Sequence, residues 1–346
     1  MTIGIIARMD KQGLSYQTRN LVRMLRPSRV LLIDSRGFNG SEVRQFPEWY
    51  SGFQTMIVNG FPSNQQVVRF LTGLTHVISC ELFYNHNLPI LAQQRGIKSY
   101  LCPNYEFADH LVNPNLPLPT KFLAPSYWHL EELQQKFPGR VEYLPPPTFH
   151  QDFMEVREKN LARSGHLRFV HIVGKRAAAD RNGTLSVIQA LKYTNESFEL
   201  VIKAQHPLDI EVDDHRVRFD YTNPDDQAEL YQDFDVLIMP RRYGGLSLPM
   251  CEALMSALPV IMTDISPNNQ LLPLSWLVPA TKTGELMTRT MIDLYEADAK
   301  ALAAKIDEFC AMSDRAMLPQ KTQAFALGYD NFSSDVLKPK YLEILK

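Results

Sequence analysis

The sequence predicts an α/β protein with two halves, each built around a parallel sheet. Apolar runs of strand length alternate with stretches that are apolar at helical spacing, which is typical of parallel sheets covered by helices. At 346 residues, the chain is long for one small domain. Three consecutive prolines within Tyr143–Phe149 separate two such alternating series, and a proline-rich connector is extended and stiff. We therefore expect two domains and a ligand cleft at the carboxyl ends of their strands.

In the first half, short apolar runs predict strands at Thr2–Ala7, Arg29–Ile33, Gln54–Val58, His76–Ser79, Lys98–Cys102 and Lys121–Ala124. Helical spacing predicts helices at Tyr16–Leu25, Asn64–Leu74, Leu88–Arg95 and Tyr127–Phe137.

In the second half, strands are predicted at Arg168–Val173, Glu199–Lys203, Val217–Tyr221, Asp235–Met239, Pro259–Met262 and Trp276–Val278. Helices are predicted at Thr184–Leu191, Asp225–Gln232, Leu248–Ala257 and Pro339–Lys346, and Thr283–Met312 is predicted to be largely helical. The predicted domains are residues 1–145 and 146–325. Residues 326–346 are expected to carry a helix that packs back towards the first domain.

Composition places the chain among ordinary globular proteins, with 45% hydrophobic and 21% charged residues. The apolar run Ile3–Ala7 is too short for a signal peptide or a membrane span, and no other run approaches the ~18 residues that a span needs. These features predict a cytoplasmic protein. The four cysteines (Cys80, Cys102, Cys251 and Cys310) lack metal-binding spacing and are expected to be reduced thiols.

Charge is distributed unevenly between the halves. Residues 1–146 contain 14 Lys and Arg against 10 Asp and Glu, a net +4, whereas the remainder has 22 against 28, a net -6. A basic first half suits an anionic partner, although an ordinary solvated surface gives the same pattern.

The most informative stretch is Asp235–Asp264, which reads as strand, glycine loop, helix and strand. Ser247 is placed to cap the helix, and Pro249 suits its first turn. The loop Gly244–Ser247, which includes Gly245 and Leu246, would present backbone N–H groups and the positive end of the helix to an anion. Glu252 is expected in the first turn, facing the same mouth, where its two oxygens suit the adjacent hydroxyls of a ribose.

Cations at three strand ends strengthen this hypothesis. Lys175 with Arg181, then Lys203, then Arg241 with Arg242 each follow or end a predicted strand. Carboxyl ends of parallel strands lie along one edge of the sheet, so these cations can converge on a diphosphate. The sequence lacks GxxxxGK[ST] and GxGxxG, so neither a P-loop enzyme nor a dinucleotide-binding fold is favoured.

In the first half, Gly13 lies in the loop after the first strand, and Glu81 and Glu106 each follow a later strand. A carboxylate there could act as a general base, polarise an acceptor hydroxyl or bind a sugar hydroxyl; a structural glutamate is the alternative. The histidines lack metal-ligand spacing. The DxD triplet ending at Asp235 enters a strand away from the ligand end, so we expect cations and helix dipoles, not a metal, to neutralise phosphates.

GGLSLPMCEALMSALPVI resembles the donor-site signature of retaining GT-B glycosyltransferases of the glycosyltransferase family 4 type. The resemblance implies two Rossmann-like domains with parallel sheets facing across a cleft, and Glu252 as the ribose-binding residue. Gly244 stands where the family has its first glutamate. Gly174 with Lys175, and Arg181 with the following Asn-Gly pair, resemble family pairs whose cations contact the diphosphate. The loop with Gly13 is similar to the family's glycine loop near donor and acceptor.

The segments PRRYGG, DRNG, NYE and APSYW are similar to a sub-group frequent in bacteriophages and bacteria. Some phage members of it are thought to glycosylate hydroxymethylated pyrimidines in DNA. This resemblance implies sugar transfer from a nucleotide-diphosphate sugar, UDP-linked more often than GDP-linked, with retention and no required metal. Lys175 and Arg181 would stabilise the leaving diphosphate, and Glu106 and Glu81 would position the acceptor. The alternatives are a glycan, lipid or small-molecule acceptor, or a non-catalytic protein that binds nucleotide sugars.

Overall fold

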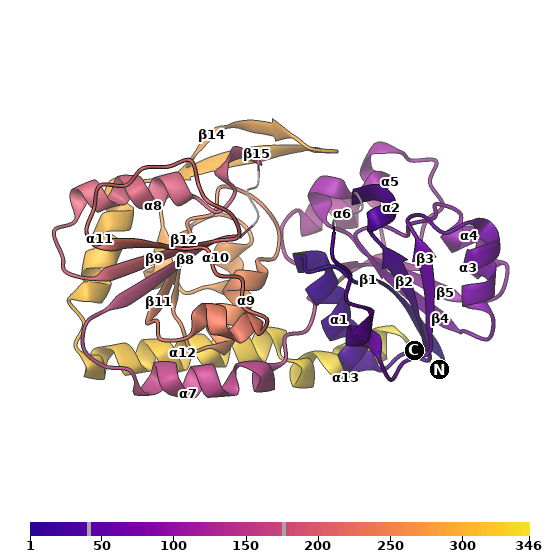
Figure 1. The fold of residues 1–346 in the computed structure, drawn as a ribbon. Helices are drawn as coiled ribbons and strands as arrows, with labels where there is room; N and C mark the ends of the chain where they lie inside the picture. The colour runs from indigo at the N-terminus through magenta and orange to yellow at the C-terminus, as the bar shows by residue number, and fades with distance from the viewer. Residues whose placement is uncertain (40–42, 175–177) are drawn as a thin grey trace. The chain divides into compact units, whose positions relative to one another are not determined.

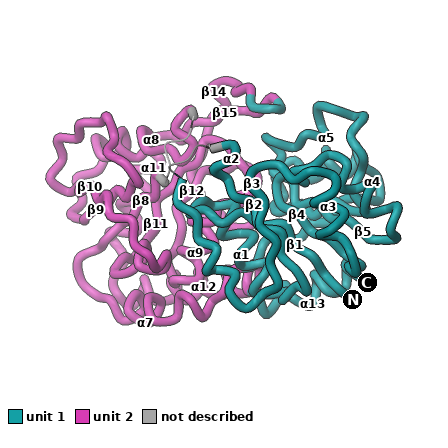
Figure 2. The backbone as a smooth tube through the Cα atoms, turned by 45° about the vertical axis from the view of Figure 1, so that its right-hand side comes forward, with its two compact units in different colours: residues 1–147, 288–290, 334–346 teal, residues 148–287, 291–333 magenta. Residues whose placement is uncertain are grey.

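The structure, a computed structural model, describes residues 1–39, 43–174 and 178–346. Its backbone divides into two compact units, which Figure 2 colours separately. Unit 1 comprises Met1–Pro147, Thr288–Thr290 and Ser334–Lys346, and unit 2 comprises Thr148–Met287 and Met291–Ser333. The chain passes from the first unit to the second between Pro147 and Thr148, within the proline-rich segment.

Unit 1 contains a seven-stranded sheet with the order β3-β2-β1-β4-β5-β6-β7 (Figure 1). Its strands are β1 (Ile3–Arg8), β2 (Arg29–Asp34), β3 (Thr55–Asn59), β4 (His76–Cys80), β5 (Lys98–Cys102), β6 (Lys121–Ala124) and β7 (Val141–Tyr143). Every neighbouring pair is parallel. All residues of β1 and β4 are buried, as expected for central strands with both faces covered.

The helices of unit 1 are α1 (Gly13–Leu25), α2 (Arg36–Asn39), α3 (Asn64–Leu71), α4 (Leu88–Gln93), α5 (Asp109–Val112), α6 (Leu130–Lys136) and α13 (Ser334–Ile344). Short 3-10 turns lie at η1 (Pro47–Tyr50) and η2 (Tyr105–Phe107). The C-terminal helix α13 belongs to this unit because Leu337 and Tyr341 are buried in it, and the Tyr341 hydroxyl donates to the Pro145 carbonyl at 3.1 Å.

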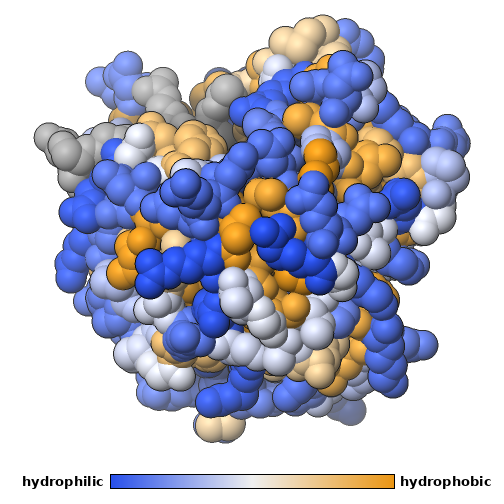
Figure 3. Space-filling view, turned by 90° about the vertical axis from the view of Figure 1, so that its right-hand side faces the viewer, coloured by the Kyte–Doolittle hydropathy of each residue, from blue (hydrophilic) through white to orange (hydrophobic). Residues whose placement is uncertain are grey.

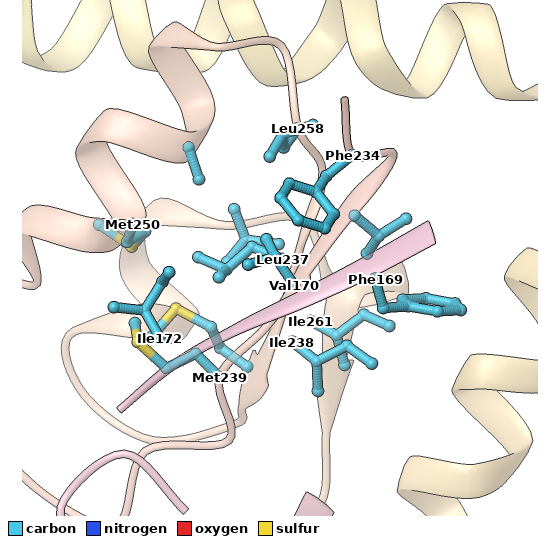
Figure 4. Close-up of a cluster of buried hydrophobic side chains, with 14 of the residues drawn as sticks. Phe169, Val170, Ile172, Phe234, Leu237, Ile238, Met239, Met250, Leu258 and Ile261 are labelled. Carbon is cyan, nitrogen blue, oxygen red and sulfur yellow. The ribbon is translucent and has the colours of Figure 1, made fainter. Parts of the chain in front are cut away.

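Unit 2 contains a six-stranded sheet with the order β10-β9-β8-β11-β12-β13. Its strands are β8 (Arg168–Gly174), β9 (Glu199–Ala204), β10 (Val217–Asp220), β11 (Val236–Ile238), β12 (Val260–Thr263) and β13 (Leu277–Val278), all paired in parallel. Figure 4 shows side chains of β8, β11, β12 and α9 packed into one core around Val170 and Leu237. The predicted α/β class, with a parallel sheet in each half, is confirmed.

The helices of unit 2 are α7 (Met154–Ala162), α8 (Thr184–Ala190), α9 (Leu248–Met255), α10 (Asn268–Leu271), α11 (Ala299–Cys310) and α12 (Asp314–Phe332). Shorter 3-10 turns are η3 (His150–Phe153), η4 (Ala178–Asp180), η5 (Leu191–Tyr193), η6 (Gln227–Tyr231) and η7 (Leu274–Trp276). Helix α12 runs past residue 326 and ends at Phe332. One residue, Ser333, separates it from α13, which belongs to unit 1.

The prediction of a largely helical Thr283–Met312 is wrong over its first half. Strands β14 (Ala280–Met287) and β15 (Met291–Ala297) form an antiparallel hairpin there. Threonines and alternately exposed residues favour a two-stranded ribbon over a helix in this segment. Helix α11 begins only after Asp298, whose Oδ1 accepts the backbone N–H groups of Lys300 and Ala301 and so caps the helix.

Figure 3 looks onto the side of unit 1 that carries α3 and α4, and hydrophobic side chains gather near the centre of this face among hydrophilic ones. Exposed large hydrophobic residues of this unit include Ile57, Phe61, Ile90 and Leu118. Among the residues that the structure describes, no helix is both long and apolar enough to cross a membrane.

Candidate functional site

The loop between β11 and α9 has the cap that its sequence predicts. Ser247 precedes α9 in an extended conformation, and its side chain accepts the backbone N–H of Met250 at 3.3 Å. Pro249 occupies the first turn, where no backbone donor is needed. The remaining N–H groups at this end of the helix, together with the helix dipole, favour an anion.

Two guanidinium groups converge on Gly244 in this loop. The residue has a φ of +114°, and a Cβ added there would come within 3.0 Å of the side chains of both Arg181 and Arg241. Arg241 is almost fully buried, donating from Nη1 to the Gly245 carbonyl at 2.7 Å, and the Arg181 guanidinium lies 5.1 Å from the ring centre of Tyr243. Only glycine fits this position, and two positive charges from separate segments are concentrated beside it.

The segment that carries Arg181 is fixed by its neighbours to the edge of the sheet. The Asn182 side chain donates to the carbonyls of Ile172 and Val173 at the end of β8, at 2.9 and 3.2 Å. The Asp180 carboxylate accepts two backbone N–H groups of α8. The Arg242 backbone N–H donates to the Arg181 carbonyl at 2.9 Å. Arg181 therefore reaches the α9 mouth from a loop with little freedom to move.

Arg242 has a different environment from Arg241. Its guanidinium donates to the carbonyl of Ala179 at 2.7 Å and to that of Tyr295 in β15 at 3.0 Å. The Tyr295 N–H in turn donates to the Arg242 carbonyl at 2.9 Å. Arg242 thus joins the loop that carries Ala179 and Arg181 to the β14–β15 hairpin, and it does not converge on Gly244.

Lys203 lies at the same edge of the sheet, one residue before the end of β9, whose last residue pairs with Gly174 at the end of β8. Its ammonium group forms an ion pair with Asp220 of β10 at 3.0 Å. Burial raises the pKa of Asp220, but hydrogen bonds from Thr222 and Lys203 outweigh it and lower the pKa to about 2. Lys203 is therefore balanced by a carboxylate. Lys175, the other predicted cation at this edge, lies outside the described residues.

Glu252 lies in the second turn of α9, so its predicted place in the first turn is wrong. The side chain is buried, and the Tyr231 hydroxyl donates to its Oε2 at 2.6 Å. Burial raises the pKa of Glu252 to about 7, while hydrogen bonds from Tyr231 and Gln227 lower it. Tyr231 was not singled out by sequence reasoning, because a partner 21 residues upstream leaves no local pattern.

In unit 1, the loop after β1 is organised by Asp10, which is fully buried. Arg8 forms an ion pair with it at 2.6 Å, and the hydroxyls of Ser15 and Ser35 donate to its two oxygens at 2.5 and 2.7 Å. Gly13 is the first residue of α1, directly beyond this network. The Arg-x-Asp spacing after the first strand could have indicated the pair, but only Gly13 was selected from the sequence.

Glu106 is buried and Glu81 is half-buried on the carboxyl side of the unit 1 sheet. Burial raises the pKa of Glu81, while the charge of Arg8 lowers it and that of Glu106 raises it further. The Asn104 amide donates to Glu81 Oε1 at 3.4 Å. Glu81 also has a φ of +66°, which is uncommon for a residue with a side chain. Each glutamate follows its strand, as predicted, since Glu81 comes directly after β4 and Glu106 lies in η2 after β5; their proposed role with the acceptor stays a prediction.

No group of three or more His, Cys, Asp or Glu side chains within the described ranges is arranged to hold a metal ion. Asp235, the second carboxylate of the DxD triplet, is buried and forms ion pairs with Lys321 and Arg163 at 2.8 and 2.9 Å. Asp235 therefore stabilises unit 2, because removing one partner of a buried ion pair lowers the free energy of unfolding by about 3–5 kcal/mol.

Residues 155–311, most of unit 2, match the family model described as glycosyl transferases group 1. This segment is therefore similar in sequence to that family. No curated protein sequence matches the chain. The whole chain is similar in fold to several solved structures, and three of them follow.

A glycosyltransferase from Rickettsia africae ESF-5 is 14% identical, with a TM-score of 0.69 over 100% of this chain and 97% of that one. Anabaena Alr3699/HepE in complex with UDP and glucose is 12% identical, with a TM-score of 0.68 over 100% and 99%. Sucrose-phosphate synthase from Thermosynechococcus elongatus is 13% identical, with a TM-score of 0.68 over 99% and 98%. The chain thus has the GT-B fold of these structures.

Proposed function

We propose that this glycosyltransferase transfers a sugar from a UDP-sugar to a hydroxyl acceptor, with retention of configuration. The observation that carries the proposal is the convergence of Arg181 and Arg241 on Gly244, at the capped N-terminus of α9. Two guanidinium groups and free backbone N–H groups suit a diphosphate, which bears two negative charges. The fold-level similarity to HepE, solved with UDP and glucose, supports uracil as the base of the donor; a GDP-sugar is the other donor class.

In the proposed reaction, the bond between the sugar C1 and the diphosphate oxygen breaks as the acceptor oxygen bonds to C1. Negative charge grows on the departing diphosphate, and Arg181, Arg241 and the amides of Gly245–Ser247 would stabilise it. The departing phosphate oxygen takes the acceptor proton, so no side chain needs to gain or lose a charge. The ionised Glu252 would accept hydrogen bonds from the ribose hydroxyls. Lys175 remains a predicted contact of the diphosphate.

Donor use can be tested by incubating the protein with UDP- and GDP-sugars and measuring nucleotide release. We expect release from at least one UDP-sugar and a loss of about 100-fold or more in Arg241→Ala, comparable to the removal of one transition-state donor. Arg218→Ala is the matched control, since Arg218 is exposed on β10. Binding of a UDP-sugar without any release would favour a non-catalytic binding protein; absence of binding to every donor would overturn the proposal.

We propose DNA as the acceptor, because unit 1 carries a cation–aromatic surface beside the Arg8–Gly13 loop. Its accessible members are Lys11, Tyr16, Arg19, Arg44 and Trp49, and the buried Phe46 supports Lys11, Arg44 and Trp49 from below. Arg19 lies 4.7 Å from the Trp49 ring centre, and Lys11 and Arg44 lie 5.0 and 4.8 Å from that of Phe46. Trp49 also stacks on Phe46 at 5.0 Å and contacts Tyr16 at 5.2 Å.

Cations interleaved with aromatic rings are typical of surfaces that bind nucleic-acid backbones and bases. One acidic residue, Glu48, is exposed within the segment from Arg44 to Trp49. The three cations of the surface, Lys11, Arg19 and Arg44, outnumber it. A glycan or lipid acceptor has no comparable need for stacked guanidinium groups, and both remain outcomes of the test.

The acceptor can be tested with duplex DNA that carries hydroxymethylated pyrimidines. We expect sugar to enter this DNA, and its binding to weaken steeply with salt. Arg44→Ala should reduce the salt slope by about 1, as the loss of one phosphate contact does. Arg95→Ala should not, because Arg95 is exposed in the turn after α4, outside the cation–aromatic surface. Transfer to a glycan or lipid while DNA stays unmodified would rule out the DNA acceptor and leave the donor proposal intact.

A further inference from the structure

Three aromatic rings meet at the carboxyl edge of the unit 1 sheet, from three different loops. Phe38 lies in α2 after β2, Phe61 follows β3, and Tyr84 follows β4. The ring centres of Phe38 and Phe61 are 5.3 Å apart, and Tyr84 lies 6.4 Å from Phe38 and 6.3 Å from Phe61. Because β3, β2, β1 and β4 are neighbours in a parallel sheet, their ends bring these loops together. We call these residues the three-ring cluster.

The cluster is buried at one end and open at the other. Tyr84 is 5% exposed, whereas Phe61 is 63% exposed. An aromatic residue that packs for stability alone would bury most of its ring. The exposed Phe61 ring, supported from behind by Phe38, instead offers a flat apolar surface to a ligand.

The backbone is constrained to hold the rings in place. A Cβ on Gly37 would lie 2.6 Å from the Gly60 backbone nitrogen, so the loops of Phe38 and Phe61 approach each other at van der Waals distance only because residue 37 is glycine. Glu81 and Tyr84 both have positive φ, +66° and +58°. Non-glycine residues in this conformation are strained, and they gather at ligand sites.

Polar groups lie beside the rings. The Arg8 guanidinium is 5.6 Å from the Phe38 ring centre. Burial raises the pKa of both Glu81 and Tyr84, and the charge of Arg8 acts against this in both. The Asn104 amide donates to Glu81 at 3.4 Å. A flat apolar surface next to a carboxyl group and a guanidinium suits a ring that has an apolar face and a polar substituent at its edge.

We propose that the three-ring cluster receives the acceptor base, turned out of its duplex, with the base stacked on Phe61 and its hydroxymethyl group directed towards Glu81. This inference rests on the proposed DNA acceptor. Several classes of enzyme that act on a base, among them glycosylases and methyltransferases, turn the base out of the stack and hold it against aromatic or apolar side chains. Glu81 is a positioning residue that hydrogen-bonds the acceptor hydroxyl, whose proton leaves with the diphosphate oxygen.

Placement of the base can be measured with duplexes that carry 2-aminopurine next to the hydroxymethylated base. The fluorescence of 2-aminopurine rises when its neighbour leaves the stack. We expect a rise with the unmodified protein and with Phe61→Tyr, which keeps the stacking surface. Phe61→Ala should lose most of the rise and lower kcat/KM for DNA by about 10- to 100-fold, the range of one lost base–aromatic stack.

Ile57→Ala is the matched control, because Ile57 is 55% exposed on β3 but lies outside the cluster; it should behave as the unmodified protein does. If DNA is modified but Phe61→Ala matches the control in both measurements, the cluster does not receive the base. If a glycan is the acceptor and Phe61→Ala lowers its kcat/KM, the cluster receives a sugar ring and the nucleobase proposal is wrong. Failure of nucleotide release, by contrast, would contradict the donor proposal itself.

Discussion

The Tyr231 hydroxyl donates to Oε2 of Glu252 across 2.6 Å, and both side chains are buried. A carboxylate in such a place is costly unless it is hydrogen-bonded. The bond from η6 to α9 therefore fixes the position of the residue that we propose to bind the ribose, and it couples that position to the ionisation of Glu252.

This pair predicts how stability depends on pH. Burial raises the pKa of Glu252 from 4.5 to about 7, so between these values the folded protein holds a proton that the unfolded chain has lost. The contribution of Glu252 to the free energy of unfolding should therefore fall as pH rises from about 4.5 to about 7. Glu252→Gln cannot titrate, and its stability relative to the unmodified protein should rise by about 1–3 kcal/mol across this window, measured by urea unfolding at pH 5 and pH 8.

Tyr231→Phe is the companion variant. It removes a hydrogen bond that favours the ionised carboxylate, so the pKa of Glu252 should rise further and the decline in stability should extend to higher pH. Parallel stability profiles for the unmodified protein and Glu252→Gln between pH 5 and pH 8 would show that Glu252 keeps an ordinary pKa, and would contradict the prediction.

Gly244→Ala should weaken donor binding by the protein that remains folded, beyond any loss of folded protein. The new methyl group would displace Arg181 and Arg241, between which the diphosphate charge is proposed to lie. We expect UDP affinity to fall by about 10-fold or more, since a charged hydrogen bond contributes about 1.5–3 kcal/mol. Calorimetric titration of UDP into the folded variant measures this.

Gly165→Ala serves as its control. Gly165 has a similar φ of +91° in the same unit, but no atom lies within 4 Å of its added Cβ. Both variants incur the backbone strain of a positive φ, about 1–3 kcal/mol, but only Gly244→Ala should lose UDP affinity. Equal UDP affinity in the two variants would mean that the guanidinium pair does not bind the diphosphate.

Local chemistry explains which parts of this site could be predicted from the sequence. Ser247 and Pro249 mark the start of α9 because capping depends on neighbours within one turn. Central strands such as β1 and β8 are apolar along their length because helices cover both faces of a parallel sheet. The placement of Arg181 near Arg241 followed from the rule that parallel strands end at one edge.

The remaining features depend on contacts between distant segments. Phe38, Phe61 and Tyr84 meet because β2 and β4 flank β1 and β3 lies beyond β2, an order that the sequence of elements does not contain. The β14–β15 hairpin was mistaken for a helix because a two-stranded ribbon outside the main sheets has no continuous apolar face. Its position is set partly by Arg242, whose carbonyl partners are 53 and 63 residues away.

Arg242 should therefore control the mobility of the β14–β15 hairpin. Its guanidinium satisfies the carbonyls of Tyr295 and Ala179, and leaving partly buried acceptors without donors costs about 1–3 kcal/mol. In Arg242→Ala, the hairpin keeps its own ladder but loses this connection to the α9 loop. We expect the Tyr295 amide, which donates to the Arg242 carbonyl, to exchange hydrogen at least about 10-fold faster, because about 1.4 kcal/mol corresponds to a factor of ten in the opening equilibrium.

Amides in the core strand β8 should change only by the loss of global stability. Arg218→Ala, which removes an exposed arginine of the same unit, should leave both sets unchanged. If amide exchange became equally faster in β8 and β15, Arg242 would support unit 2 as a whole. The proposed specific link between the Ala179–Arg181 loop and the hairpin would then be wrong.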